Sequence, residues 1–310
     1  MSNGMMDSDG IDRRGFLRCM SWAGTAVVWT VASGVPRSAL IGSAAAAETG
    51  LAFAQISDSH IGFNKPANPD VTATLQEAIK RVGASGEKPA FMIHTGDVTH
   101  LSKPGEFDTA AQVIGGAGLT THFVPGEHDI LEDDGKSFLN HYGKGTQGAG
   151  WYSFDEGGVH FVGLVNVVDL KGGGMGNLGH EQLEWLEKDL AGRSASTPVV
   201  VFAHIPLWIV YPEWGWGTQD GAQALTYLKR FGSVTVLNGH VHQVLQKVEG
   251  KVTFHTARST AFPQPEPGKA ESPGPIKNVP AERLRSMLGL TRVSYVQRTG
   301  PLAVVDNSLE

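Results

Sequence analysis

Asn238-Gly239-His240-Val241-His242 follows directly on the apolar run Ser233-Val234-Thr235-Val236-Leu237, which places two imidazoles at the end of a predicted strand. Gly239 permits the chain to turn at that point, so the pair is predicted to lie on a loop. Two histidines in such a loop are either metal ligands or solvated turn residues. The motifs upstream decide between these interpretations.

Composition indicates a globular protein with a sizeable core. Of the 310 residues, 41% are hydrophobic and 18% are charged, which excludes a disordered chain. The formal net charge of −6 gives no reason to expect bulk binding of nucleic acid, but it leaves open a phosphate substrate held by metal.

The first 47 residues have the features of an export signal. Asp12-Arg13-Arg14-Gly15-Phe16-Leu17-Arg18 resembles the twin-arginine motif, an apolar stretch follows to Val35, and Ala45-Ala46-Ala47 suits cleavage. An uncleaved membrane anchor is the alternative. We predict cleavage, export to the periplasm or medium through the twin-arginine machinery, and no membrane association afterwards. Cleavage removes Cys19, the only cysteine, so the mature chain has no disulfide.

Three apolar runs in the first half are each followed by polar residues. The runs span residues 51–56, 89–93 and 121–124, and the polar clusters are Asp58-Ser59-His60, Gly96-Asp97 and Gly126-Glu127-His128-Asp129. Apolar residues at helical spacing over 70–82, with Asp70 as N-cap, and over 105–114 separate the runs. Strand ends of an open α/β sheet are where such proteins bind ligands.

The second half has more antiparallel character. A hairpin is predicted across 151–164, a helix through 183–190, and a strand over 198–203 that ends at His204. The remaining elements are a hairpin over 244–254, an extended proline-rich excursion over 263–280, and closing strands at 292–297 and 302–306.

Asp58-x-His60, Gly96-Asp97, Gly126-Glu127-His128-Asp129, His204 and Gly239-His240-x-His242 stand in the order of the motifs of the calcineurin-like metallophosphoesterase superfamily, which the chain resembles over residues 51 to about 255. The resemblance is to the branch similar to cyclic-nucleotide phosphodiesterases. It implies a layered α-β-β-α sandwich, with two facing mixed sheets flanked by helices, in one domain over 48–310.

The resemblance also implies the roles of the site residues. Asp58, His60 and His242 would hold the first metal, Asp97 would bridge, and His204 and His240 would hold the second. A hydroxide bridging the metals would attack phosphorus, His128 would protonate the departing oxygen, and Asp129 would orient His128. Mixed carboxylate and imidazole ligands suit Fe, Mn, Zn, Co or Ni, with Fe and Mn favoured.

Glu127 departs from the family pattern, which has Asn at this position. The substitution adds one negative charge beside the second metal. Either Glu127 ligates and favours a trivalent ion such as Fe(III), or it points away and leaves the second metal weak or absent.

The expected function is hydrolysis of a small-molecule phosphodiester, such as a cyclic nucleotide. The alternatives are a phosphomonoesterase and a metal-binding scaffold of the cell envelope without turnover. The loop 207–216 carries three of the seven Trp residues. It either stacks on part of the substrate or forms a packed cap.

Overall fold

The computed structural model describes residues 50–84, 88–168, 170, 174–296 and 302–310 in full, and residues 26–32 and 35–41 as backbone. In the latter, β1 (Ala26–Ala32) and β2 (Val35–Ile41) pair antiparallel in a unit separate from the one that begins at Leu51. The predicted twin-arginine motif and cleavage site lie outside the described residues.

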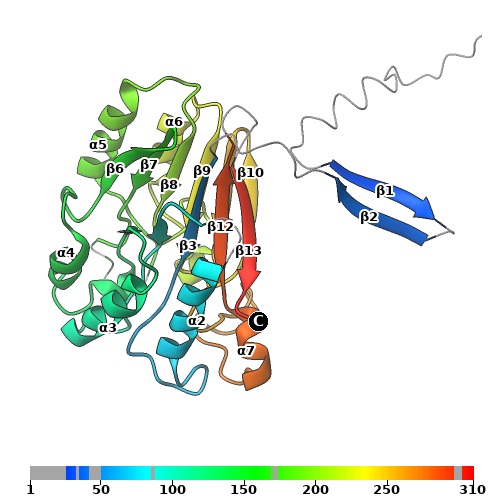
Figure 1. Cartoon of the computed structure of the whole chain (residues 1–310). Coiled ribbons are helices and arrows are strands. Elements are labelled where there is room, and N and C mark those ends of the chain that lie inside the picture. The colour runs from blue at the N-terminus through cyan, green and yellow to red at the C-terminus, as the bar shows by residue number, and fades with distance from the viewer. Residues whose placement is uncertain are drawn as a thin grey trace, which may run out of the picture. The chain divides into compact units, whose positions relative to one another are not determined.

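Two mixed sheets form the larger unit (Figure 1). The five-stranded sheet has the order β13-β12-β3-β4-β5, with bounds Ala303–Ser308, Gly289–Tyr295, Leu51–Ile56, Met92–His94 and Thr121–Phe123. The six-stranded sheet has the order β10-β11-β9-β8-β7-β6, with bounds Gln246–Glu249, Val252–Thr256, Val234–Asn238, Val199–Phe202, Val159–Gly163 and Tyr152–Glu156.

The sheets face each other across one apolar layer and carry helices on their outer sides. Phe53 and Phe91 on one side of that layer meet Phe161 and Phe202 on the other. The helices that pack against the five-stranded sheet are α2 (Val71–Ala84), α3 (Pro104–Gly115), α4 (Lys136–Tyr142) and α7 (Ala281–Met287). The six-stranded sheet is covered by α5 (His180–Ala191) and α6 (Gly221–Leu228). The predicted α-β-β-α sandwich is confirmed.

The structure shows why two predicted segments adopt their conformations. Asp70 caps α2, because its Oδ1 accepts a hydrogen bond of 2.9 Å from the backbone N–H of Ala73. The proline-rich excursion at 263–280 contains no helix or strand, as its composition predicted. In the part of the chain that the structure describes, no helix combines the length and apolar character that crossing a membrane requires.

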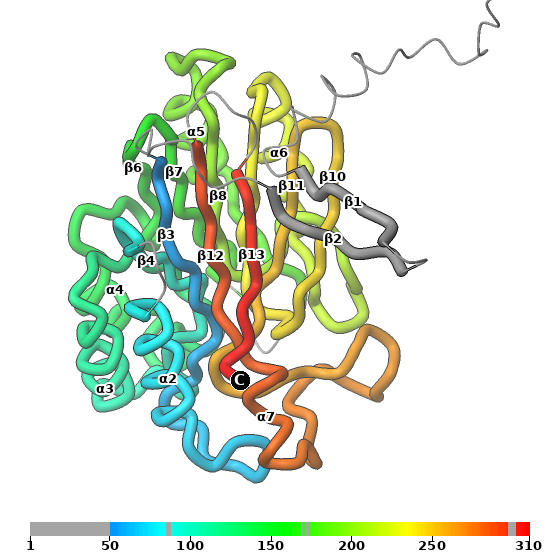
Figure 2. The backbone as a smooth tube through the Cα atoms, turned by 45° about the vertical axis from the view of Figure 1, so that its right-hand side comes forward, coloured from blue at the N-terminus to red at the C-terminus, as the bar shows by residue number. Residues whose placement is uncertain are grey.

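Strand direction sets the position of the site. β3, β4 and β5 are parallel neighbours in one sheet, and β7, β8 and β9 are parallel neighbours in the other. The carboxyl ends of parallel strands lie at the same edge of a sheet, so the polar clusters that follow them are brought together. The chain closes on itself through β12, which pairs antiparallel with β3 although more than 230 residues separate them (Figure 2).

One hydrogen-bonded pair of side chains links the two sheets through β11 and β13. His255 on β11 is fully buried, and its Nε2 lies 2.9 Å from Oδ2 of Asp306 on β13. Burial raises the pKa of Asp306, but the hydrogen bond with His255 outweighs it, so the pKa is lowered from its ordinary value. His255 therefore supports the sandwich rather than the site.

Candidate metal centre

The seven predicted metal ligands converge at the carboxyl ends of β3, β4, β5, β8 and β9. They form two groups whose ligand atoms lie within 4.8 Å of one another: Asp58, His60 and His242 in one, and Glu127, His204 and His240 in the other. The Oδ2 atom of Asp97 lies 3.4 Å from Nε2 of His60 and 3.4 Å from Nε2 of His204. One carboxylate oxygen thus stands between the two groups, as a bridging ligand would.

Several buried polar atoms in this cluster have no hydrogen-bond partner and are positioned to bind a metal. The Oε2 of Glu127 and Nε2 of His204 are buried and 2.8 Å apart, yet neither has a hydrogen-bond partner, and the same holds for both ring nitrogens of His240. Buried polar atoms are otherwise almost always hydrogen-bonded. A cation between these atoms would satisfy Oε2 of Glu127, Nε2 of His204 and one ring nitrogen of His240.

The far sides of two rings are held by backbone carbonyls. The Nδ1–H of His204 donates to the carbonyl of Thr95 at 2.7 Å, and the Nδ1–H of His242 donates to the carbonyl of Phe262 at 2.6 Å. This fixes the tautomer and leaves Nε2 of each ring with a lone pair that faces the centre, which is the usual support of a metal-binding imidazole.

Most of the candidate ligands have a strained backbone. The residues with φ in the left-handed region are Asp58 at 53°, His60 at 41°, Asp97 at 52°, His240 at 69° and His242 at 53°. Each such conformation costs about 1 to 3 kcal/mol for a residue with a side chain and persists only where the surroundings impose it. Here the loops hold one another, since the N–H of Asp58 donates to Gly96 and that of His60 donates to Asp97.

Gly239 is required for space. Its φ lies outside the left-handed region, and the turn predicted there is made by His240 and His242 instead. A Cβ at Gly239 would lie 2.0 Å from Oγ of Ser57 and 2.6 Å from Oδ2 of Asp58. The close approach of two loops from different sheets therefore excludes any side chain.

The pKa values of side chains in the cluster indicate that protons and a metal compete for the same atoms. Burial raises the pKa of Asp58, but the imidazoles of His242 and His204 outweigh it and bring that pKa to about 2. Burial lowers the pKa of His204, but the carboxylates of Asp97 and Glu127 raise it well above its ordinary value. A metal at Nε2 of His204 therefore competes with a proton for the same lone pair, so its affinity falls as the pH falls.

The Glu127 side chain points into the centre. Its Oε1 lies 2.9 Å from Nδ1 of His240, and its Oε2 faces His204. The alternative in which Glu127 points away is therefore wrong.

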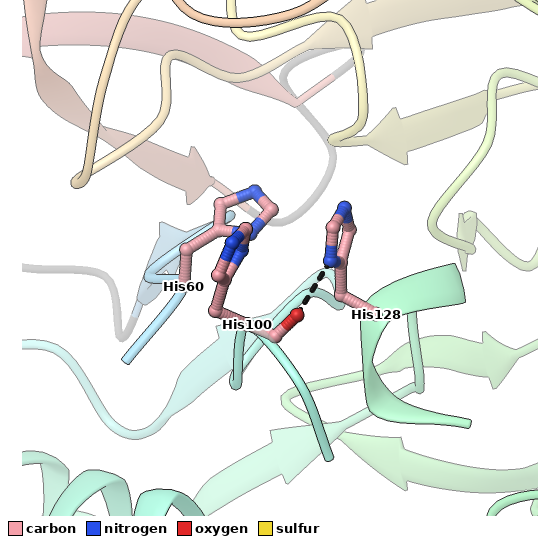
Figure 3. Close-up of side chains that lie close together, drawn as sticks. All are labelled: His60, His100 and His128. Carbon is pink, nitrogen blue, oxygen red and sulfur yellow. Dashed lines mark hydrogen bonds between the residues drawn. The ribbon is translucent and has the colours of Figure 1, made fainter. Parts of the chain in front are cut away.

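His128 is held beside the first group by a residue outside the predicted site (Figure 3). Its Nδ1–H donates to the backbone carbonyl of His100 at 2.7 Å, and the two rings stack with centroids 5.0 Å apart. A ring nitrogen of His100 lies within 4.8 Å of ring nitrogens of His60 and His128. Sequence reasoning gave His100 no role, and the only signal for it was its place three residues after Asp97.

Asp129 acts on His128 through its charge, one of several that outweigh burial and raise the His128 pKa, and among the described residues no hydrogen bond joins the two side chains. The Asp129 carboxylate is fully buried and accepts hydrogen bonds from the backbone N–H groups of Val98, Thr99 and Gly126 at 2.8 to 3.0 Å. Asp129 therefore joins the loop after β4 to the loop after β5, and the carbonyl of His100 orients the His128 ring.

The tryptophan loop is a packed cap. Trp214 and Trp216 are buried, their rings meet edge to face at 5.1 Å, and both pack with Val241, the residue between His240 and His242. Of the two interpretations of this loop, the packed cap is confirmed. The two rings pack against Val241 and so support the loop that carries the histidine pair.

Comparison with known proteins agrees with this geometry. The family profile of the calcineurin-like phosphoesterases matches residues 51–244, which contain all the clusters described above. The chain belongs to the calcineurin-like phosphoesterase family. Members of this family use a dinuclear centre of divalent metals, and the two ligand groups joined by Asp97 are its candidate in this phosphoesterase.

The chain is similar to two curated relatives and to one solved structure. A probable glycerophosphodiester phosphodiesterase of Arcobacter nitrofigilis is 26% identical over 224 residues, which cover 66% of this chain and 77% of the relative. A probable cyclic nucleotide phosphodiesterase of Rhodopseudomonas palustris is 25% identical over 207 residues, covering 62% and 71%. A dimetal phosphatase of Danio rerio shares the fold, with a TM-score of 0.60 at 13% identity, covering 83% of this chain and 99% of that one.

We expect Gly239→Ala to destabilise the protein by about 1 to 3 kcal/mol, because its Cβ overlaps Ser57 and Asp58. The displaced Asp58 should also weaken metal binding. Urea unfolding and metal analysis of the purified variant measure both effects. Gly232→Ala is the matched control, since its Cβ would lie 3.6 Å from the nearest atom, the carbonyl oxygen of Ala195. Equal stability and metal content in the two variants would contradict the argument from space.

Proposed function

We propose that this protein is a dinuclear metal-dependent phosphodiesterase. The observation that carries the proposal is the pair of buried carboxylate–imidazole groups that share the Asp97 carboxylate, with His128 held beside them. Asp58, His60 and His242 would hold the first metal, and Glu127, His204 and His240 would hold the second. Bound metals would supply positive charge for the phosphoryl group and a water that ionises near neutral pH.

The protein itself supplies the proton for the departing alcohol through His128. Its Nδ1–H is committed to the carbonyl of His100, which leaves Nε2 to donate. Burial lowers the pKa of His128, but the carboxylates of Asp97 and Glu127 outweigh it and raise the pKa above its ordinary value. A raised pKa favours the charged form of the ring, which is the form that can donate a proton. A metal-binding scaffold without turnover would not need this residue.

The names of two relatives favour a diester over a monoester. Both a glycerophosphodiester and a cyclic nucleotide are phosphodiesters, and the relatives named for these substrates align over most of the phosphoesterase domain. A phosphomonoesterase is the second candidate, because the fold alone does not choose between the two reactions.

Glu127 bears on the identity of the metals. The Asn of the family pattern is neutral, so Glu127 lowers the net charge of the centre by one. Iron and manganese suit this ligand set, and a trivalent ion such as Fe(III) at the second position would restore the charge.

We further propose that residues 1–47 direct export through the twin-arginine machinery and that the mature protein begins at Glu48. The sequence around Arg13 and Arg14 supports this, although it lies outside the described residues. Replacing both arginines by lysine should leave the protein in the cytoplasmic fraction, whereas Arg18→Lys should not. Export of the doubly substituted chain would disprove the proposal.

The expected effect of His128→Ala is a fall in kcat of about 10²- to 10⁴-fold on bis-p-nitrophenyl phosphate, with metal content unchanged. The assay uses residues 48–310 after chelation and add-back of Mn, Fe, Zn, Co or Ni, with p-nitrophenyl phosphate as the monoester. The rate ratio of the two substrates separates diesterase from monoesterase. If the wild-type protein binds two ions and hydrolyses neither substrate, the scaffold is the better assignment.

Replacing Glu127 by Asn should keep two metals but shift the second position from trivalent toward divalent ions. The reason is the loss of one negative charge without loss of an oxygen ligand. Metal analysis and the electron paramagnetic resonance signal of Fe(III) measure the change. Unchanged occupancy and unchanged metal preference would show that Glu127 does not compensate charge.

A further inference from the structure

A cavity of about 490 Å³ lies at the carboxyl ends of β5 and β7. Most of the side chains that line it are apolar, and they come from the loops after both strands, from α4 and from the segment between α4 and β6, among them Leu131, Phe138, Ala149, Val165 and Val168. Its volume falls within the range of about 300 to 1,000 Å³ that is typical of small-molecule sites. None of these residues belongs to the metal centre.

The strand order places this cavity next to the second metal group. β5 is the parallel neighbour of β4, which Asp97 follows, and β7 is the parallel neighbour of β8, which His204 follows. The ends of β5 and β7 therefore continue the same edge beyond the metal ligands. Pro125 and Ile130, which both line the cavity, flank the four residues that carry Glu127 and His128.

Hydrogen bonds fix the cavity walls to the catalytic groups. The hydroxyl of Ser102 donates to the backbone carbonyl of His128 at 2.6 Å and accepts the N–H of Leu131 at 2.8 Å. On the other wall, Nδ2 of Asn166 donates at 2.7 Å to the carbonyl of Ile205, the residue after His204. One hydroxyl thus connects Leu131 to the proton donor, and one amide connects the β7 loop to a candidate ligand.

The cavity leaves large apolar side chains in contact with water. Leu131 is 54% exposed and Val168 is 37% exposed, and both line it. Covering such surface is favourable for any ligand group that fits. Among the described residues that line the cavity, Asp134 is the charged one, and its carboxylate disfavours an anionic group.

We infer that this cavity binds an uncharged apolar ester group, aryl or alkyl, of the phosphodiester substrate while the phosphoryl group lies at the metal centre. The inference rests on the proposed phosphodiesterase function and names the class of substrate. It assigns selectivity to the loops after β5 and β7, which carry no predicted metal ligand beyond Glu127.

Titration calorimetry of the metal-loaded His128→Ala variant with dimethyl, methyl phenyl and methyl hexyl phosphate tests this inference. We expect the phenyl or hexyl ester to bind at least about tenfold more tightly than the dimethyl ester, because only these groups cover the apolar walls. The phenyl and hexyl arms distinguish an aryl from an alkyl group. Equal affinity for all three esters would overturn the inference.

Two variants locate the effect. Ala149→Leu fills the cavity, and Leu131→Asn makes its exposed wall polar, so both should reduce the preference to below about threefold. Leu131 is largely exposed, so its variant remains informative if Ala149→Leu does not fold. Ile209→Asn is the matched control, because Ile209 is 52% exposed, follows ligand His204 on a loop, and does not line the cavity. An equal loss of preference in the control would overturn the inference.

Turnover of the same three esters separates the inference from the proposed function. Release of methanol, phenol or hexanol by the wild-type protein reports hydrolysis, whereas calorimetry on the metal-loaded His128→Ala variant, which turns over far more slowly, reports binding. Hydrolysis of all three esters with equal affinities would refute binding of the ester group in the cavity but would still support the phosphodiesterase function. Absence of hydrolysis together with a preference for the phenyl or hexyl ester would refute the phosphodiesterase and keep an apolar binding site.

Discussion

The carboxylate of Asp97 is the interaction on which the centre depends. Its Oδ2 lies 3.4 Å from rings that reach it from both sheets, His60 after β3 and His204 after β8. Its Oδ1 accepts the backbone N–H of His128 at 2.9 Å. One side chain thus connects the two candidate ligand groups and holds the backbone of His128. Because Asp97 contacts residues that follow strands of both sheets, the way in which the sheets pack also fixes the geometry of the candidate centre.

This arrangement is costly without metal. Five candidate ligands have left-handed backbone conformations, and buried lone pairs on Glu127, His204 and His240 have no partner. Backbone hydrogen bonds between the loops that follow the strands, together with the hydrogen bonds that the buried Asp129 carboxylate accepts, hold the loops in these strained conformations. The scaffold therefore keeps the ligands in place before the ions arrive, and metal binding recovers the interactions that the buried atoms lack.

The residues of the candidate centre were predictable from the sequence because local pattern marks strand ends and because the order of the motifs resembles a known family. Short apolar runs followed by polar clusters mark the strand ends, and the resemblance implied that Asp58 and His242, which follow strands of different sheets, converge. The positions that escaped prediction depend on contacts between distant segments. The bond from His128 to the carbonyl of His100, the backbone partners of Asp129 and the close approach at Gly239 leave no periodic signal. A carbonyl in particular has no sequence signature, since every residue carries one.

The same division of the molecule explains how a shared centre can serve different substrates. The loops after β3, β4, β8 and β9 carry candidate metal ligands, whose geometry is fixed by both sheets and leaves little room for change. The loops after β5 and β7 carry Glu127 and His128 on one side and an apolar wall on the other. Substitutions in that wall would change the inferred site of the ester group at residues that do not belong to the candidate centre. Selectivity can therefore change at this end of the edge while the chemistry at the other end stays the same.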